Sequence, residues 1–351
     1  MNIEKRSAQI GAAILIFALL LRLTGGFLSP SAMAKGFSRL EEKGHFVPQR
    51  GPGAISMGTG LTAPSTTVPT IPTTVLPPTT ATAPTMPTEP PLLPQPIPIR
   101  FVTGDMEYVK FRYATDCSLR TELEPLLLRP LVLQLEMGDP TVLIVHSHGT
   151  ESFTKTPGQD YQEIGDHRTT NADYNMIAVG EELANLLRAR GISVIHDLQQ
   201  HDAKSYSGAY ASSRKSVEDY LAEYPSIQLV LDLHRDSALN PDGSQYATSA
   251  TVNGKPSAQI MLLAGSDAKN GTHPCWQENL ALALKLQVLL EKEHPGITRK
   301  TLLRGGVFNQ DLCTGMLIVE VGAAGNTLQE ALRAMAPLAD AIAALRYGAA
   351  S

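Results

Sequence analysis

The chain has 351 residues, of which 43% are hydrophobic, 5% aromatic and 18% charged. This length allows one to three domains, and the hydrophobic fraction suffices for a core in part of the chain. The net charge of −5 at pH 7 offers no basic surface, so nucleic acid is not an expected partner. Cys117, Cys275 and Cys313 lack the spacing of a zinc finger, and their number is compatible with one disulfide or with three thiols.

The N-terminal residues have the features of an export signal. Lys5 and Arg6 precede the apolar run Ile10–Leu21, which is shorter than the ~20 residues that span a bilayer. Ala32-Met33-Ala34 has the small-residue pattern of a cleavage site. Residues 1–34 are therefore predicted to be a cleaved signal peptide or an uncleaved membrane anchor. Either way the positive flank stays inside and the rest of the chain is expected outside the cytoplasm.

Residues 35–99 are predicted to form a disordered linker. Pro and Thr are dense from about residue 61 onward, as in Thr66-Thr67-Val68-Pro69-Thr70. This composition buries too little apolar surface to fold, and it favours the extended polyproline conformation. About forty such residues would reach ~120 Å at about 3.1 Å each. The segment suits a tether for the folded residues that follow, and a featureless spacer is an equally compatible interpretation.

Residues 100–351 are predicted to form one domain of alternating strands and helices. The expected strands cover Val142–Val145, Ser193–Ile195, Gln228–Leu233, Ala258–Leu263 and Met316–Val321. The expected helices cover Asn175–Arg190, Ser212–Tyr224, residues 276–293 and Thr327–Leu345. Gly191 and Pro225 follow the first two helices, where such residues commonly end a helix. The alternation predicts an α/β fold with a mostly parallel central sheet flanked by helices.

Polar residues follow or end three of the expected strands. Val142–Val145 runs into the sequence HSHGTE, Leu229–Leu233 runs into HRDS, and the last strand carries Glu320. Functional sites in open α/β sheets lie at the carboxyl ends of such strands. Histidine and carboxylate groups bind zinc, and a catalytic zinc needs about three protein ligands and a nearby carboxylate. The residues therefore indicate a metal-assisted hydrolase.

The two histidines of HSHGTE are both candidate metal ligands. If the chain stays extended, the side chains of His146 and His148 point to the same face, because side chains alternate with period two. Spacing alone does not choose between them. His148 is preferred because it lies further beyond the strand end, and His146 would then orient a ligand. Two loop histidines with ordinary hydrogen bonds are the alternative interpretation.

His234 and Glu320 carry the other two main roles. His234 ends a strand that is apolar apart from Asp232, and an imidazole buried there needs a metal or a firm hydrogen bond. Glu320 is the predicted general base, because surrounding Leu, Ile and Val raise the pKa of a carboxyl group towards neutral. Arg235 and Asp236 are predicted to bind the substrate or orient ligands.

Five motifs in one order resemble the stage II sporulation protein P family over about residues 100–347. They are HSHGTE (146–151), LDLHRDS (231–237), PCWQENL (274–280), NQDL (309–312) and VEVG (319–322) followed by Asn326-Thr327. The chain departs from the expected pattern at Gly149, where a second hydroxyl residue is usual. This family comprises cell-wall hydrolases with a fold similar to the zinc-dependent N-acetylmuramoyl-L-alanine amidases.

The resemblance implies a site that binds Zn²⁺. In the related amidases a Glu near the start of the first helix is a ligand, but residues 171–175 contain none. The carboxylate role is therefore assigned to Glu151, with Asp166 and Asp173 as alternatives. The polar loop at Asn309 is expected to line the cleft and contact the substrate.

The resemblance also implies the substrate and the partners. The expected substrate is peptidoglycan, cleaved between the muramoyl lactyl group and the first L-alanine, and the family is associated with endopeptidase action on cross-linked stems. Expected partners are a lytic transglycosylase and a membrane scaffold of the engulfment machinery, if the host makes spores. A non-catalytic wall-binding module and a metallo-peptidase acting on other amides are the alternative functions.

Overall fold

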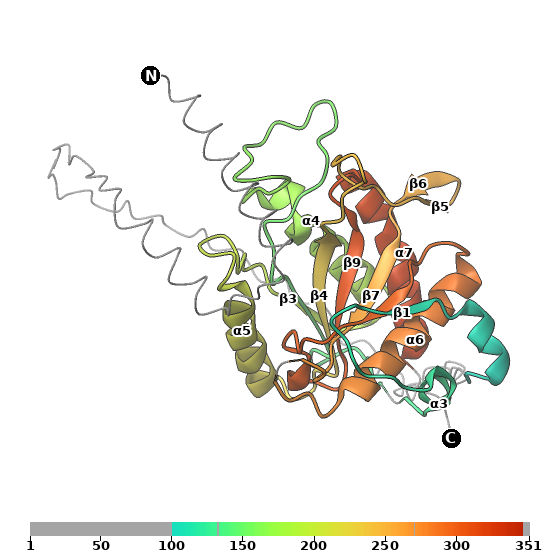
Figure 1. Cartoon of the computed structure of the whole chain (residues 1–351). Coiled ribbons are helices and arrows are strands. Elements are labelled where there is room, and N and C mark those ends of the chain that lie inside the picture. The colour runs from blue at the N-terminus through green and yellow to red at the C-terminus, as the bar shows by residue number, and fades with distance from the viewer. Residues whose placement is uncertain (1–99, 132, 270, 347–351) are drawn as a thin grey trace, which may run out of the picture. The chain divides into compact units, whose positions relative to one another are not determined.

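The computed structural model describes residues 100–131, 133–269 and 271–346 (Figure 1). The predicted export segment, residues 1–34, and the predicted linker, residues 35–99, lie outside this part of the chain. None of the helices in the described residues has both the length and the apolar character needed to cross a bilayer.

A seven-stranded sheet forms the centre of the described residues. Its strands are β1 (Phe111–Tyr113), β2 (Val142–Val145), β3 (Val194–His196), β4 (Leu229–Asp236), β7 (Ile260–Ala264), β8 (Thr301–Leu303) and β9 (Met316–Ala323), in the order β1-β8-β7-β9-β4-β2-β3. Five neighbouring pairs are parallel, and only β7 and β9 are antiparallel. A hairpin of β5 (Ala250–Val252) and β6 (Lys255–Ser257) forms a separate two-stranded sheet. The prediction of a mostly parallel α/β sheet is confirmed.

Helices cover both faces of this sheet (Figure 1). They are α3 (Leu123–Leu128), α4 (Met176–Ala189), α5 (Ala209–Glu223), α6 (Trp276–Glu293) and α7 (Leu328–Leu345), with short 3-10 helices η1 (Thr103–Tyr108), η2 (Ala172–Tyr174) and η3 (Gln310–Leu312). The Asn175 side chain accepts a hydrogen bond from the Ile177 amide and so caps α4. Thr327 and Glu330 form a capping box at the start of α7. The four predicted helices are confirmed, although α5 begins three residues earlier than expected.

Alternate residues of the inner strands face different layers of helices. Leu231 and Leu233 of β4 belong to the core that packs against α4, α6 and α7. Val230 of the same strand packs instead with Val217 of α5. Because side chains alternate along a strand, Asp232 and His234 also face the α5 side. Ile318 of β9 packs on that side with Tyr210 and Phe308, so Glu320, two residues further on, also faces it.

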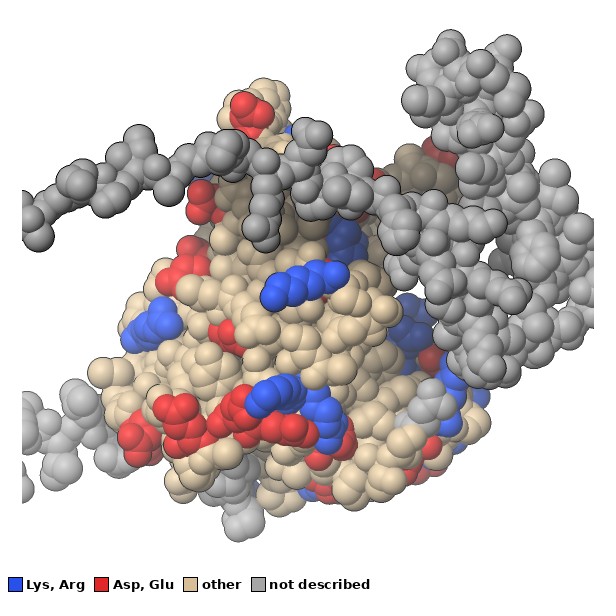
Figure 2. All heavy atoms as spheres, turned by 90° about the vertical axis from the view of Figure 1, so that its left-hand side faces the viewer, with Lys and Arg blue, Asp and Glu red and all other residues tan. Residues whose placement is uncertain are grey.

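The surface on the α5 side carries both signs of charge. Arg214 pairs with Glu218 at 2.9 Å, and Lys215 pairs with Asp219 at 2.7 Å, one helical turn apart along α5. Figure 2 shows this side of the molecule, with Asp and Glu side chains lying beside Lys and Arg side chains in its lower part. These exposed ion pairs add little stability. Because they mix both signs of charge, the exposed face of α5 is neither uniformly acidic nor uniformly basic.

Candidate active site

His234 lies at the centre of a group of acidic side chains. It is 4% exposed, and its Nδ1 lies 3.5 Å from Glu151 Oε2 while its Nε2 lies 3.0 Å from Asp232 Oδ1. Burial alone would lower the pKa of the imidazole, but the charge of Asp232, together with Tyr210 and Glu151, raises it well above its usual value. The site therefore favours a positive charge at this position, which a proton or a metal ion can supply.

Glu151 is held as a carboxylate beside His234. It is buried, and the backbone amide of Arg235 donates a hydrogen bond of 3.2 Å to its Oε2. Burial would raise the pKa of Glu151, but His234 and Arg235 outweigh this effect and lower it. An ionised, buried carboxylate next to an imidazole is a suitable pair of metal ligands.

His148 reaches the same place from the loop after β2. Its ring stacks on Tyr206 with 4.4 Å between centroids, and it meets the His234 ring edge to face at 5.4 Å. Its Nδ1 is buried without a hydrogen-bond partner and lies 3.7 Å from Asp202 Oδ2. Burial would raise the pKa of Asp202, but the neighbouring His148, Thr150 and Arg168 lower it to about 2. The structure thus brings His148, Glu151 and His234 together.

His146 lies on the other side of the sheet, under α4. Its Nδ1 is 3.1 Å from the Leu233 carbonyl oxygen, and its Nε2 is 2.9 Å from His196 Nε2. Burial and the nearby His196 lower the pKa of His146 to about 3. The condition for His146 and His148 to share a face, an extended chain, is not met, because β2 ends at Val145 and the chain turns before His148. With both ring nitrogens engaged, His146 supports β4 behind His234 and is not available as a ligand.

Glu320 lies directly across from His234 in the register of β9 and β4. The residue is half-buried, but its Oε2 is buried and has no hydrogen-bond partner. Burial raises the pKa of Glu320 to about 8, against the opposing charge of His234. A carboxyl group in this state can exchange a proton near neutral pH.

The three predicted substrate-binding residues are engaged with the protein. The Arg235 guanidinium donates to the carbonyl oxygens of Ser152 at 3.0 Å and His167 at 2.9 Å. Asp236 pairs with Arg299 at 2.7 Å. The Asn309 amide donates to the Tyr210 carbonyl oxygen at 2.9 Å and to Ser213 Oγ at 3.2 Å. These contacts hold the loops around the site in place.

Several residues of the site were not predicted from the sequence. Ser147 donates to Asp232 from its amide at 2.8 Å and from its hydroxyl at 2.6 Å, and Asp232 in turn faces His234. Tyr206 and Tyr210 bracket the His148 ring. The isolated acid in the apolar strand at Asp232 was the available signal, whereas nothing in the sequence marks the tyrosines, because they reach the site from the loop after β3 and the first turn of α5.

His148, Glu151 and His234 are of the ligand types that zinc prefers, although they are not arranged around a common point. Among the described residues, no group of three His, Cys, Asp or Glu side chains stands in metal-binding geometry. Buried polar atoms normally have hydrogen-bond partners, but His148 Nδ1, His234 Nε2 and Glu320 Oε2 are among the buried side-chain atoms of the described residues that have none. The 3.5 Å between His234 Nδ1 and Glu151 Oε2 is close to the ~3.3 Å that separates two ligands of a tetrahedral zinc with bonds of about 2.0–2.1 Å.

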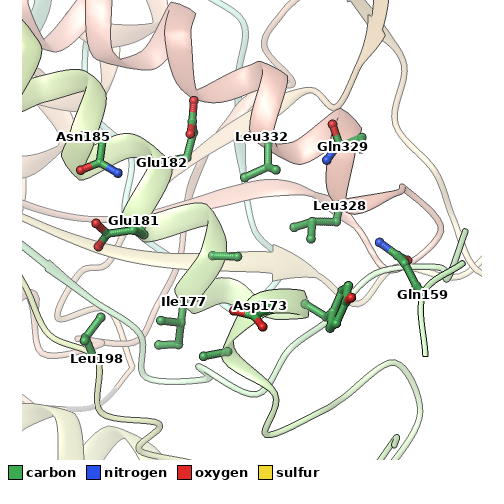
Figure 3. Close-up of a pocket in the computed structure, with 13 residues that line it drawn as sticks. Gln159, Asp173, Ile177, Glu181, Glu182, Asn185, Leu198, Leu328, Gln329 and Leu332 are labelled. Carbon is green, nitrogen blue, oxygen red and sulfur yellow. The ribbon is translucent and has the colours of Figure 1, made fainter. Parts of the chain in front are cut away.

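A pocket of about 610 Å³ lies on the opposite side of the sheet between α4 and α7 (Figure 3). Asp173, one of the predicted alternative carboxylate ligands, lines this pocket, as do Glu181 and Glu182, and does not lie in the site of the histidines. The other alternative, Asp166, is exposed and accepts a hydrogen bond from Gln245. Neither residue is therefore placed with His148 and His234.

The structure thus defines a mixed α/β protein with a buried cluster of histidine and carboxylate groups at the ends of β2, β4 and β9. The model of the family described as Stage II sporulation protein P (SpoIIP) matches residues 102–343, and the chain belongs to this family. Stage II sporulation protein P of Bacillus subtilis (strain 168) is 31% identical over 225 residues. The match covers 60% of this chain and 53% of that protein, so it spans about half of the relative's length.

Solved structures of amidases are also similar to the chain. The CwlD amidase from Clostridioides difficile, in complex with the GerS lipoprotein, is 12% identical, with a TM-score of 0.36 over 58% of this chain and 94% of that one. The N-acetylmuramyl-L-alanine amidase Ami1 from Mycobacterium abscessus is 14% identical, with a TM-score of 0.35 over 59% and 96%.

Proposed function

We propose that this protein is a zinc-dependent peptidoglycan hydrolase that acts on the cell wall during sporulation and cleaves the bond between the muramoyl lactyl group and the first L-alanine of the stem peptide. The observation that carries the proposal is the meeting of His148, Glu151, His234 and Glu320 on one side of the sheet. Membership of the stage II sporulation protein P family supports the sporulation and cell-wall setting.

His148, Glu151 and His234 would hold the zinc. When bound, zinc polarises a carbonyl group and lowers the pKa of water towards about 7. Asp232 faces His234 Nε2 at 3.0 Å and would orient the ring with Nδ1 turned to the metal side, beside Glu151. Ser147 holds Asp232 in this position through two hydrogen bonds.

Glu320 would move the proton during hydrolysis. It would accept a proton from the attacking water as the water oxygen bonds to the amide carbon. As the carbon–nitrogen bond breaks, Glu320 would donate the proton to the leaving amine, and the products would be a lactyl carboxylate and a stem peptide with a free amino group. The unpartnered Oε2 of Glu320 supports this role, because it has no hydrogen bond to give up.

The test measures zinc content and stem-peptide release from purified cell wall for the wild type, Glu320→Ala and His234→Ala. We expect about one zinc per wild-type chain and released stems that begin with L-alanine. Glu320→Ala should keep the metal and lose activity, whereas His234→Ala should lose the metal. An active metal-free wild type would overturn the proposal. New amino groups within the stems would instead indicate a peptidase, and wall binding without release would indicate a binding module.

The cellular setting follows from the same family membership. We expect the domain to work outside the cytoplasm, attached to the membrane or secreted, beside a lytic transglycosylase and a membrane scaffold. Endopeptidase action on cross-linked stems is a further expectation, which the analysis of amino groups above also tests.

A further inference from the structure

Another cavity, separate from the pocket between α4 and α7, lies next to the candidate active site on the α5 side of the sheet. It has a volume of about 400 Å³, within the range of about 300–1,000 Å³ for small-ligand pockets. The residues that matter in its wall are Tyr210, Arg214, Thr272, Phe308, Asn309 and Asp311. Tyr210 belongs to both places, because its ring centroid lies 5.6 Å from that of His148 and 6.3 Å from that of His234. Tyr210 therefore lies between the active-site histidines and this cavity.

Two aromatic rings form the apolar part of this cavity. The Tyr210 and Phe308 rings lie 5.9 Å apart with 58° between their planes, and both pack against a buried cluster of the sheet that contains Met261, Leu263, Leu302 and Ile318. A Cβ on Gly306 would lie 2.9 Å from the Phe308 ring, so only glycine leaves room for the ring in this position. The Phe308 ring therefore lies close against the backbone at Gly306.

The backbone at Phe308 and Asn309 is strained. Their φ angles are 53° and 61°, in the left-handed region that residues other than glycine rarely adopt. The Asn309 side chain holds this turn against α5 through its bonds to Tyr210 and Ser213. Strained residues that the surroundings hold firmly occur preferentially at ligand-binding sites.

The charges in the wall favour an uncharged ligand. Among the described residues of the lining, Arg214 is the one cation, and it donates to both oxygens of Asp311 at 2.9 Å and pairs with Glu218 at 2.9 Å. A carboxylate ligand would find this cation already neutralised by two carboxylates. A ligand with hydroxyl groups can bond to Asp311 and Thr272 while its apolar face packs on the rings. A pyranose sugar has both features.

We infer that this cavity, the sugar pocket (Tyr210, Thr272, Phe308, Asn309 and Asp311), binds an N-acetylhexosamine ring of the glycan strand next to the muramoyl unit that is cleaved. The assignment rests on the proposed function and adds to it the course of the glycan strand across the protein surface. The glycan strand would run from the active site past Tyr210 towards Asp311, and Tyr210 would separate the reacting unit from its neighbour.

The first test is calorimetric binding of the tetramer of N-acetylglucosamine, which has no stem peptide. The wild type and Glu320→Ala should bind it equally. Phe308→Leu keeps apolar volume but loses the aromatic face, so it should bind about tenfold more weakly. The matched control is Phe111→Leu in the edge strand β1, because Phe111 packs with the core on the other face of the sheet, and this variant should bind as the wild type does. Thermal unfolding of each variant shows whether it is folded.

A second variant keeps the test decisive if Phe308→Leu does not fold. Thr272 is exposed at the rim, so Thr272→Trp should fill the cavity without disturbing the core and should abolish tetramer binding. In hydrolysis assays, both variants should raise KM for long glycan strands, leave kcat unchanged, and act normally on a muramoyl peptide without a neighbouring sugar.

The two proposals fail in different ways. If the wild type releases L-alanine stems but binds no tetramer, or binds it equally well in the folded variants, the sugar pocket is wrong and the proposed function stands. If tetramer binding depends on Phe308 and Thr272 but no wall is hydrolysed, the sugar pocket stands and the proposed function is wrong.

Discussion

The imidazole of His234 and the carboxyl group of Glu320 lie opposite each other on adjacent strands, because the parallel register of β4 and β9 pairs these two residues. Both face the α5 side of the sheet. This places the proposed proton acceptor beside the proposed metal ligand without any contribution from a flexible loop. Groups carried by strands are held more firmly than groups carried by loops, which suits a catalytic pair.

Glu320→Gln should remove the proton acceptor and leave the metal site intact. The amide has nearly the same size, so we expect unchanged zinc content and unfolding, and a fall in kcat of about 10²–10⁴-fold. Stem-peptide release under saturating substrate measures the effect. A variant with more than a tenth of the wild-type kcat would show that another group moves the proton.

Glu320 should also make the metal-free protein less stable as the pH rises from about 5 to 8. Burial raises the pKa of this carboxyl from 4.5 to about 8, so over this interval the folded protein keeps a proton that the unfolded chain has lost. Higher pH then favours unfolding. Urea denaturation in the presence of a chelator should show the stability of the wild type, relative to Glu320→Gln, declining across the interval. A difference independent of pH would contradict the raised pKa.

The two histidines of HSHGTE should differ when each is replaced by alanine. His148→Ala should lose zinc and remain folded, because its ring lies at the edge of the site against Tyr206. His146→Ala should lower the free energy of unfolding by about 2–4 kcal/mol, since it leaves a cavity and an unpaired Leu233 carbonyl oxygen. Urea denaturation and zinc content measure both effects. Loss of zinc from a folded His146→Ala variant would show that His146 is a ligand after all.

Asp232→Asn should weaken zinc binding through its effect on His234. The amide keeps the shape but loses the charge that faces His234 Nε2, and it accepts less well from Ser147. Loss of a carboxylate that orients a ligating histidine typically costs about 10–100-fold in metal affinity. Competition with a chelator of known affinity measures this change. Asp242→Asn, in an exposed turn, is the control and should bind zinc as the wild type does.

Gly180→Ala should destabilise the protein although it lies within a helix. A Cβ at this position of α4 would clash with His196 Nε2 and would lie 2.5 Å from His146 Nε2, so the imidazole rings must move. We expect a loss of about 1–3 kcal/mol in the free energy of unfolding, where alanine in an unobstructed helix interior would add about 1 kcal/mol. Gly104→Ala, with no atom within 4 Å of the added Cβ, is the control. Equal stabilities of the two variants would show that α4 and His146 are not in close contact.

Sequence patterns alone predicted five of the seven strands of the sheet and the positions of His234 and Glu320 along two of them. The apolar runs of β2, β4 and β9 are long enough to be recognised, and His234 and Glu320 lie at or within strands, where alternation sets the face of a side chain. Short strands such as β1 and β8, with three residues each, show no periodicity and were missed. The antiparallel direction of β7 depends on a non-local pairing that no local pattern encodes.

Only the tertiary structure decided which histidine reaches the site and what surrounds it. The alternation of side chains predicts which face of the sheet a residue occupies only as long as the strand continues. Because β2 ends at Val145, His146 and His148 reach opposite sides of the sheet. Tyr210 reaches the site because α5 begins earlier than its apolar pattern suggests and packs on β9. Asp236 pairs with Arg299 and Asn309 donates to the Tyr210 carbonyl oxygen, and both partners are distant along the chain. Local patterns thus predict which side chains can do chemistry, whereas strand ends, register and packing determine which of them meet.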